Sequence, residues 1–443
     1  MTDKSGLGTF VTEDHEMGSS GLDLFTLPPI DKSQVDGTNK EYLLQANITN
    51  EGPYEFIIPN DSYEYIPMSE IYLKGTFRII KADGTDLADD DKDKFTLCNN
   101  FPQTLFQQVE VSINGQVVND LSTSNYPYKS FIENHLSYDH DLKRTALWAR
   151  EMYIEDPIGH ETNLATGLAQ AGKGFRKRRD KAFNKDVQFI MKLHIDFLQV
   201  MRYLPPGVEL KIKLIRSQDH FGIITAAPHV FKVNIKQLKI LMRKITLDPA
   251  VASALMSMNT KKPFVYPVAH SKVRTFTIHK DLKTVQLSQV VRGRLPRSFL
   301  FTLLPASATD ANSAINPFHF RHFDLNYLQV FIDGIPIHPL ALQPNWEDDG
   351  PLEQYHWFLN NIGLHQTQSN DITFEMFKSN SVFFPYDMSP DLCNGVHSTG
   401  AKNGIVDIHL GFKTALTENV TLMFYGVYDE TVLIDGNKAV TIV

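Results

Sequence analysis

The sequence predicts an all-β protein made of two tandem eight-stranded jelly rolls, a double jelly-roll, with short helical insertions. Three observations lead to this fold class: the chain has 443 residues, apolar and polar residues alternate along most of it, and its two halves share a pattern. Single hydrophobic cores stop growing at about 250 to 300 residues, so two domains are expected. The 29 Phe, 16 Tyr and 23 Pro favour strands and loops over helix bundles.

Two hairpin patterns are the clearest feature shared by the halves. The segments VEVSINGQVV, 109–118, and LQVFIDGIPI, 328–337, alternate in polarity around Asn114-Gly115 and Asp333-Gly334. Such residue pairs supply the positive φ angles of a type I′ turn between two strands. Their positions therefore predict equivalent hairpins in the two halves.

Two further sets of residues recur at similar spacing. Before the hairpins, Asn99, Phe101 and Phe106 correspond to Asn316, Phe318 and Phe323. After the first hairpin, Leu204, Val208, Leu210 and Ile212 correspond to Leu416, Val420, Leu422 and Phe424. β-Proteins reuse alternating patterns and such turns, so chance similarity stays open as an alternative. If the repeat is real, each unit of about 200 residues with many short strands fits a double-sheet jelly roll.

The predicted organisation divides the chain into four parts. They are a flexible N-terminal arm at 1–40, an N-terminal jelly roll at 41–250, a linker helix at 251–263 and a C-terminal jelly roll at 264–443. Asp248-Pro249 offers an N-cap and a first-turn proline for the linker helix. NYPYKSFIENHLSY, 125–138, and QYHWFLNNIG, 354–363, are aromatic segments that we expect to form helical insertions.

The N-terminal arm is polar and rich in Gly and Ser around one apolar island, LDLFTLPPI. Two interpretations are equally open. The arm docks onto a surface through Leu24, Phe25 and Leu27, or it is a disordered tail.

Composition excludes some classes of function. A net charge of -8 and a pI near 6.1 argue against a dedicated nucleic-acid binder. Cys98 and Cys393 have no ligand-like spacing, which fits a reducing compartment such as cytosol or nucleus. With no apolar signal region and no run of about 18 apolar residues, we expect a soluble, non-secreted protein without a membrane span. We therefore expect the glycosylation sequons at Asn47, Asn60 and Asn419 to stay unused.

Two charged segments stand out. GKGFRKRRDK, 172–181, is the basic cluster, with Lys173, Arg176, Lys177, Arg178, Arg179 and Lys181. One interpretation is that it contacts packaged nucleic acid or a neighbour's acidic loop. The other is that it forms a solvated, protease-sensitive loop; we favour the solvated loop, because one short basic run binds phosphate weakly.

The acidic segment DGTDLADDDKDK lacks the Gly and terminal Glu of a calcium loop, so we expect it to be solvated as well.

Two histidine groups are weak site candidates. His319 and His322 alternate with Phe in HFRHF, and residues three apart on a strand face opposite sides, which argues against a metal pair. A second group consists of His135, Asp139, His140 and Asp141. A polar loop explains this second group better than a catalytic dyad.

The sequence contains no phosphate-binding glycine loop and no nucleophile elbow. We therefore predict no catalytic, cofactor-binding or metal-binding residues, no cofactor and no enzymatic activity.

Four segments resemble a known family. They are LFQQVEVSINGQVV with NYPYKSFIENHLSY, LHIDF with RYLPPGVELKIKLIRSQDHF, NPFHFRHFDLNYLQVFIDGIPI, and VTLMFYGVYDETVLIDGNKAV. Together they resemble the capsid protein of Polinton (Maverick) elements and adintovirus-like viruses, over most of residues 20–443. The resemblance implies a structural major capsid protein of the double jelly-roll lineage.

The resemblance further implies what such a protein assembles with. Three copies with two towers each would form a trimeric, pseudo-hexameric capsomer, and capsomers would build an icosahedral shell around double-stranded DNA. Implied partners are copies of itself, penton or minor capsid proteins and, weakly, packaged DNA. Its implied location is the virion capsid, after synthesis in host cytoplasm and assembly in nucleus or cytoplasm. The arm would lie inside the shell, and the insertions at 138–185 and 338–380 are candidates for contacts or outer surface.

Three alternatives stay open beside this interpretation. A minor or penton capsid protein would be shorter and contain one jelly roll. A jelly-roll carbohydrate-binding protein would need convergent carboxylates or exposed aromatics in one concave face. A host gene domesticated from such an element would have the same sequence features.

Overall fold

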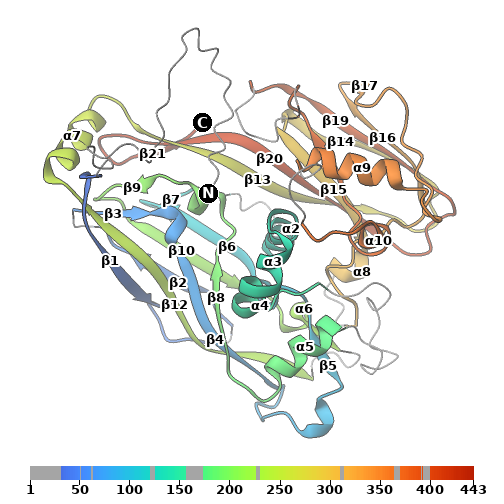
Figure 1. Ribbon diagram of the computed structural model, residues 1–443, viewed down its shortest axis with the longest axis horizontal. Helices are drawn as coiled ribbons and strands as arrows, with labels where there is room; N and C mark the ends of the chain where they lie inside the picture. Colours follow the sequence, from blue (N-terminus) through green and yellow to red (C-terminus); the bar gives the residue numbers. More distant parts are fainter. Residues whose placement is uncertain are drawn as a thin grey trace, which may run out of the picture.

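The computed structural model describes most of the chain. The described residues are 31–49, 51–60, 63–119, 125–155, 173–225, 230–309, 314–363, 370–390, 392 and 400–443. Figure 1 shows two sheet-rich halves side by side, with α7 (Pro249–Asn259) connecting their strands. The apolar island of the arm and Cys393 lie outside the described residues.

The first half contains two main antiparallel sheets. One sheet has the order β8-β4-β12, with β1 on the far side of β12, and the other has the order β2-β10-β6-β7. The strands of these sheets are β1 (Gln34–Leu43), β2 (Tyr54–Ile58), β4 (Tyr72–Lys81), β6 (Phe106–Ile113), β7 (Gln116–Val117), β8 (Val187–Lys192), β10 (Leu210–Arg216) and β12 (Phe231–Leu247). The short additional strands are β3 (Glu64–Pro67), β5 (Phe95–Leu97), β9 (Tyr203–Leu204) and β11 (Ile223–Thr225).

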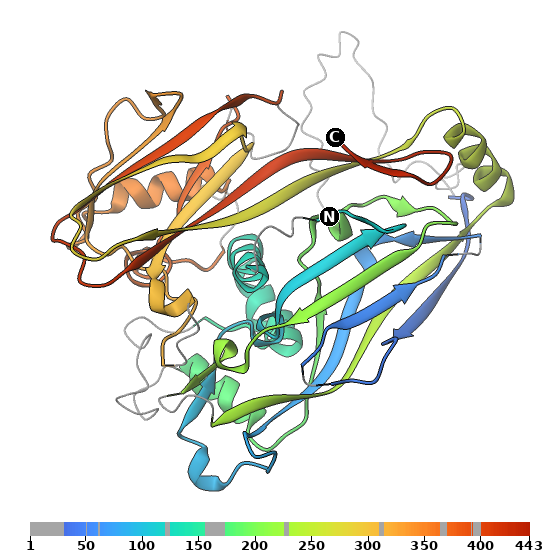
Figure 2. The ribbon, with the colours of Figure 1, turned by 180° about the vertical axis from the view of Figure 1, so that it is seen from behind.

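The second half repeats this arrangement. Its sheets have the orders β13-β20-β15-β18 and β14-β19-β16-β17, and β21 pairs with β20. The strands are β13 (Phe264–Ile278), β14 (Thr284–Arg294), β15 (Ser298–Pro305), β16 (Leu325–Ile332), β17 (Ile335–Pro336), β18 (Phe384–Asp387), β19 (Asn403–Phe412), β20 (Val420–Ile434) and β21 (Val440–Ile442). Seen from behind in Figure 2, the long β13 and β20 run from the α7 end to the second half.

Strand order identifies each half as a jelly roll. Numbering the eight main strands of a half in chain order, one sheet always has the order 1-8-3-6 and the other 2-7-4-5. The same order in both halves confirms the predicted fold class, two tandem eight-stranded jelly rolls with helical insertions.

The two predicted hairpins are confirmed in detail. Asn114 and Gly115 have φ of 47° and 82°, and Asp333 and Gly334 have φ of 49° and 78°, as a type I′ turn requires. Asn114 Oδ1 accepts a hydrogen bond from the Glu209 amide of the neighbouring chain segment at 2.8 Å. Asp333 Oδ1 accepts one from the Ile405 amide at the same distance. Each turn is therefore fixed to its sheet by the same side-chain contact.

The other proposed correspondences need correction. A β-bulge begins the strand before each hairpin, and it makes Leu325, not Phe323, the counterpart of Phe106. The set from Leu204 to Ile212 is matched wrongly, because β10 is the seventh strand of its roll and β20 the eighth. The correct counterpart of β10 is β19. Alternation with a period of two recurs in many strands, so similar spacing does not identify which strand a pattern belongs to.

The boundary of the N-terminal arm at residue 40 is also wrong. β1 already begins at Gln34, which pairs with Leu247 of β12. Its sequence, QVDGTNKEYL, is polar and mostly exposed, so it lacks the alternation that marks a half-buried strand. Backbone pairing at a sheet edge holds such a strand without an apolar face.

The helices lie mainly in connections between strands. They are α1 (Phe101–Thr104), α2 (Tyr126–Ser137), α3 (His140–Leu142), α4 (Trp148–Glu151), α5 (Lys173–Ala182), α6 (Asp219–Gly222), α7, α8 (Ala306–Thr309), α9 (Leu352–Asn361) and α10 (Phe374–Ser379). α2 and α9 confirm the two predicted helical insertions, and both follow the fifth strand of their roll. The Asp248 carboxylate accepts from the Ala250 amide and caps α7. None of the described helices has the length and apolar composition needed to cross a membrane.

Candidate functional site at the junction of the two jelly rolls

Helix α2 occupies the junction of the two rolls, as Figure 1 shows. Its Phe131 stacks on Phe318 of the second half, with ring centroids 4.3 Å apart and ring planes 5° apart. Tyr128 meets the same Phe318 ring edge-on at 5.7 Å, and Phe320 lies 5.8 Å from Phe131. All four rings are buried. The hydrophobic core of the first roll therefore continues into the second half through one face of α2.

A polar face of the same helix bonds to the long strands of the second half. Glu133 Oε1 accepts from the Tyr425 hydroxyl of β20 at 3.1 Å, and Glu133 Oε2 accepts from His194 Nδ1 at 2.7 Å. Burial alone would raise the pKa of Glu133, but the charge of Lys129 and the hydrogen bond from His194 lower it to about 2. The carboxylate is therefore charged at neutral pH.

Lys129 connects this carboxylate to a second one. Its Nζ donates to Asp196 Oδ1 at 2.8 Å and lies 3.7 Å from Glu133 Oε1. Asp196 in turn accepts from the backbone amide and the hydroxyl of Ser271 in β13, both at 2.9 Å. One buried lysine thus joins two carboxylates, and each carboxylate holds a different strand of the second roll.

His135, two residues after Glu133 in α2, forms another connection. Its Nδ1 lies 2.9 Å from Glu155 Oε1, and its Nε2 lies 3.1 Å from the Ser381 hydroxyl of the second half. Burial lowers the pKa of His135, and both of its ring nitrogens have hydrogen-bonding partners. Lys143 Nζ donates to the His135 carbonyl at 2.8 Å and also to the Asn370 carbonyl across the junction.

The predicted polar loop around these residues is therefore wrong. His135 lies in α2 and is 1% exposed. Asp139 caps α3 by accepting from the Leu142 amide at 2.8 Å, and His140 Nδ1 lies 2.6 Å from Asp371 Oδ1. His135 and His140 are bound by Ser381 and Asp371, partners far along the chain that the local sequence does not display.

His319 and His322 have different surroundings. Both precede β16, and His319 is buried, which lowers its pKa to about 4. His322 stacks on Trp346 with ring centroids 4.5 Å apart, and its Nδ1 accepts from the Asp324 amide. Among the described residues, no group of three or more His, Cys, Asp or Glu side chains is arranged to hold a metal ion.

The basic cluster is a helix and not a solvated loop. Arg178 of α5 is fully buried and donates to the carbonyls of Leu97 and Ile154 at 2.8 and 3.0 Å. Arg179 is also mostly buried and is paired with Asp93 and Asp180. Two of the arginines that suggested a phosphate-binding patch thus stabilise the fold.

The acidic segment likewise has a buried residue. Asp91 is 5% exposed and bonds to Lys81 and Lys94, both at 2.9 Å. Hydrogen bonds from Lys94 and Lys81 hold the pKa of Asp91 well below its usual range. The expectation of a wholly solvated loop is wrong at this position, because Lys81 and Lys94 neutralise the Asp91 carboxylate.

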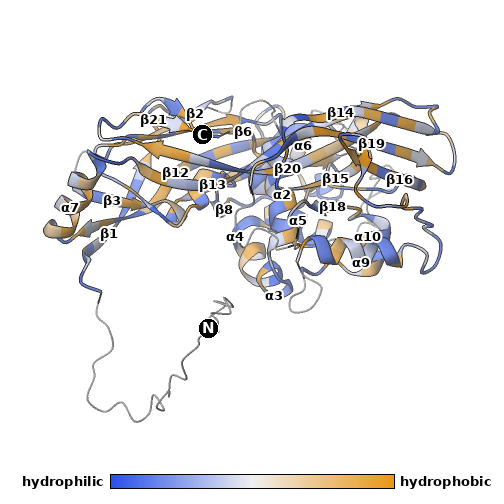
Figure 3. Ribbon diagram, turned by 90° about the horizontal axis from the view of Figure 1, so that it is seen from above, coloured by the Kyte–Doolittle hydropathy of each residue, from blue (hydrophilic) through white to orange (hydrophobic). Residues whose placement is uncertain are grey.

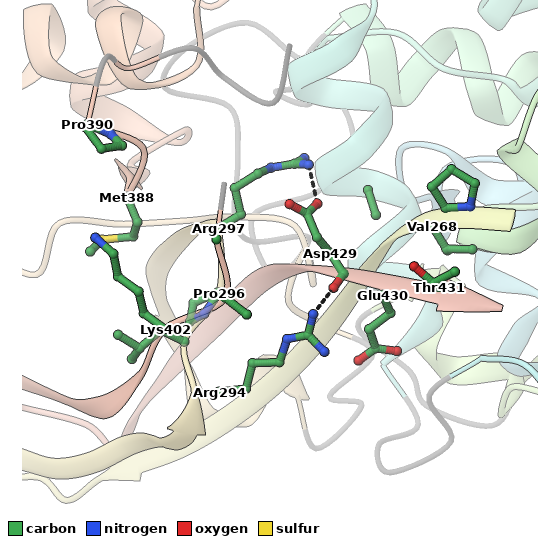
Figure 4. A pocket seen from close by; sticks show the side chains of 15 residues that line it. Val268, Arg294, Pro296, Arg297, Met388, Pro390, Lys402, Asp429, Glu430 and Thr431 are labelled. Carbon is green, nitrogen blue, oxygen red and sulfur yellow. Dashed lines mark hydrogen bonds and ion pairs between the residues drawn. The ribbon is translucent and has the colours of Figure 1, made fainter. Parts of the chain in front are cut away.

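A cleft of about 870 Å³ lies in the second roll between β13, β20 and the segments before β15 and β19. Figure 4 shows two arginines joined to Asp429: Arg297 bonds to the Asp429 carboxylate at 2.5 Å, and Arg294 donates to the Asp429 carbonyl. Glu430 lies 2.6 Å from His270, and although burial would raise its pKa, that hydrogen bond and Lys272 lower it to about 2. These charges neutralise one another, so the described lining of the cleft presents no pair of convergent carboxylates for acid-base chemistry.

Comparison with known proteins shows the same fold elsewhere. No family model matches the chain. The Sputnik virophage structure from cryo-EM has a TM-score of 0.59 at 10% identity, covering 97% of this chain and 93% of that one. The PBCV-1 virus capsid model scores 0.57 at 10% identity, covering 95% and 99%. The mavirus major capsid protein scores 0.56 at 11% identity, covering 97% and 95%.

The chain has the double jelly-roll fold of viral major capsid proteins. Because the match covers nearly all of each chain, it includes both rolls and their connection. A relative from Caenorhabditis elegans, the uncharacterized protein F54H12.2, is 25% identical over 354 residues, covering 77% of this chain and 81% of that one. The name of this relative states no activity.

Proposed function

We propose that this chain is a structural, non-enzymatic major capsid protein. In this proposal three copies form a trimeric capsomer of pseudo-hexameric outline, and capsomers assemble into an icosahedral shell around double-stranded DNA. The observation that carries the proposal is that two rolls of identical strand order are fixed side by side by buried contacts of α2. Three such chains would present six similar towers, which fits a hexagonal lattice while keeping closed threefold symmetry.

The finer assignments belong to the same proposal. The sequence resemblance supports an origin in the Polinton or adintovirus-like lineage, a virion location, and penton or minor capsid proteins as partners. The separate sheets of the two halves support a division into two jelly rolls joined by a linker around α7, with the first roll beginning at β1 (Gln34) and the second at β13 (Phe264). Weak contact with packaged DNA would involve the exposed residues of α5, such as Lys173 and Lys177.

Light scattering on the purified protein tests the proposal. We expect a particle of three times the chain mass of 50.3 kDa. At higher concentration, electron microscopy should show hexagonal sheets or closed shells. A protein that stays monomeric at high concentration and binds a glycan specifically would contradict the capsid assignment and favour the carbohydrate-binding alternative.

A further inference from the structure

Helix α7 has an unusual surface for an exposed helix. Its sequence, PAVASALMSMN, contains no charged residue, yet only Asn259 is buried. Met258 is 63% exposed, and Val251, Leu255 and Met256 are only partly buried. A helix on the surface of a soluble protein usually carries charged or polar residues on its outer side. The composition of α7 therefore indicates a surface that another segment covers.

An apolar groove continues this surface. It has a volume of about 310 Å³, and the residues that line it include Tyr65, Met201, Tyr203, Leu255 and Phe264. Leu255 belongs to α7, so the helix forms one wall of the groove. Met201 is 86% exposed in the described structure. Helix and groove together form one continuous apolar patch, and such patches commonly mark contact sites.

The chain enters the described structure at this groove. Ser33 accepts a hydrogen bond through its carbonyl from the amide of Asp248, the residue that caps α7. Gln34 Nε2 donates to the hydroxyl of Tyr203, a groove residue, at 3.2 Å. In Figure 3, β1 and β3 lie beside α7 at one end of the molecule. Residues 1–30 therefore connect to the fold next to the exposed apolar patch.

We propose that residues 22–30 of the same chain, LDLFTLPPI, bind in this groove and cover α7. The segment has five large apolar residues in nine positions, and its nine residues reach at most about 30 Å from Asp31. Its single charged residue, Asp23, is opposite in sign to Arg202 at the groove. Attachment through the adjacent β1 gives this segment a high effective concentration at the groove, which favours it over a segment from another molecule. The contact does not depend on the proposed capsid function.

Hydrogen exchange of the full-length protein tests this contact. We expect the double variant Phe25→Asp/Leu27→Asp to raise the exchange rates of the 249–259 amides about tenfold or more, because their cover is lost. The β6–β7 hairpin should keep its rates, which shows that the fold is intact. The matched control Phe10→Asp/Val11→Asp changes the same arm outside the island and should leave α7 unaffected. Unchanged exchange of α7 in the first variant would overturn the proposal, and so would protection of α7 that is lost on dilution, since that indicates a second copy.

Cysteine cross-linking identifies which chain supplies the segment. Met201→Cys is combined in turn with Leu24→Cys, Phe25→Cys or Leu27→Cys, in a background where Cys98 and Cys393 are replaced by Ala. A disulfide within one chain in at least one pair, with none between Met201→Cys and a cysteine at position 10, supports the proposal. If disulfides form only between chains, the groove binds the arm of a neighbouring chain. If none of the three pairs forms a disulfide, the contact does not exist. Either result overturns the proposal.

Discussion

Replacing Glu133 by Gln tests how much the polar contacts at the junction stabilise the protein. The substitution keeps the shape of the side chain but removes the charge that faces Lys129 and His194. In the folded protein the pKa of Glu133 falls from 4.5 to about 2, which corresponds to about 3 kcal/mol of stabilisation at neutral pH. Loss of one partner from a buried ion pair costs a similar amount, about 3 to 5 kcal/mol. We therefore expect Glu133→Gln to lower the free energy of unfolding by about 3 kcal/mol at pH 7.

The pH dependence of this loss gives a second test. Because the folded pKa lies below the unfolded value, the stabilisation is fully present above about pH 5 and is lost as the pH falls from 4.5 towards 2. Urea unfolding followed by circular dichroism should show a difference between the two proteins that is large at pH 7 and much smaller near pH 2.5. The control Glu55→Gln removes an ion pair with Lys211 in which both side chains are about one-third exposed, and it should cost less than about 1 kcal/mol. Equal losses for Glu133→Gln and Glu55→Gln, or a loss that does not change with pH, would refute the reasoning.

Three other substitutions have expected outcomes that thermal or urea unfolding can measure. Arg178→Met leaves one buried and one partly buried carbonyl without their donor and should destabilise by about 3 kcal/mol, whereas a loss under 1 kcal/mol would mean that the arginine is not structural. Gly75→Ala should destabilise by about 2 kcal/mol, because the added Cβ would overlap the ring of Phe189, while Gly400→Ala has open space and should be neutral. Glu430→Gln should cost about 1 to 2 kcal/mol, less than Glu133→Gln, because its partner Lys272 is 28% exposed and solvent screens the pair; a loss as large as that of Glu133→Gln would contradict this.

Local features of the fold were predictable from the sequence, and long-range ones were not. The two type I′ turns follow from Asn114-Gly115 and Asp333-Gly334, since only a few residue types accept positive φ there. Helix α2 follows from the spacing of its aromatic residues. β1 was missed because an edge strand needs no apolar face, and β10 was matched to the wrong strand because all strands share one period.

The junction shows the limit of sequence reasoning most clearly. His135 was recognised as a polar residue, but its partner Ser381 lies 246 positions away. Glu133 was not singled out at all, and Tyr425 lies 292 positions from it. The local sequence does not distinguish a buried charged residue from an exposed one. Only its partner far along the chain does. The spacing of Lys129 and Glu133, four residues apart on one helical face, was the signal available, and it is equally typical of a solvated helix.

The two rolls share a strand order but differ in where the helix after the fifth strand lies. This difference explains how the two rolls are held together. Both rolls carry an insertion after the fifth strand, but α2 of the first insertion lies at the junction, whereas α9 of the second packs against β18 of its own roll. Two rolls that buried only their own cores would be free to rotate about a linker. Here the Phe131 and Phe318 rings share one core, and Glu133 and Asp196 fix β20 and β13 at separate points. The position of α2 at the junction therefore holds the two rolls together through a shared core and two polar contacts, as the proposed shell unit would require.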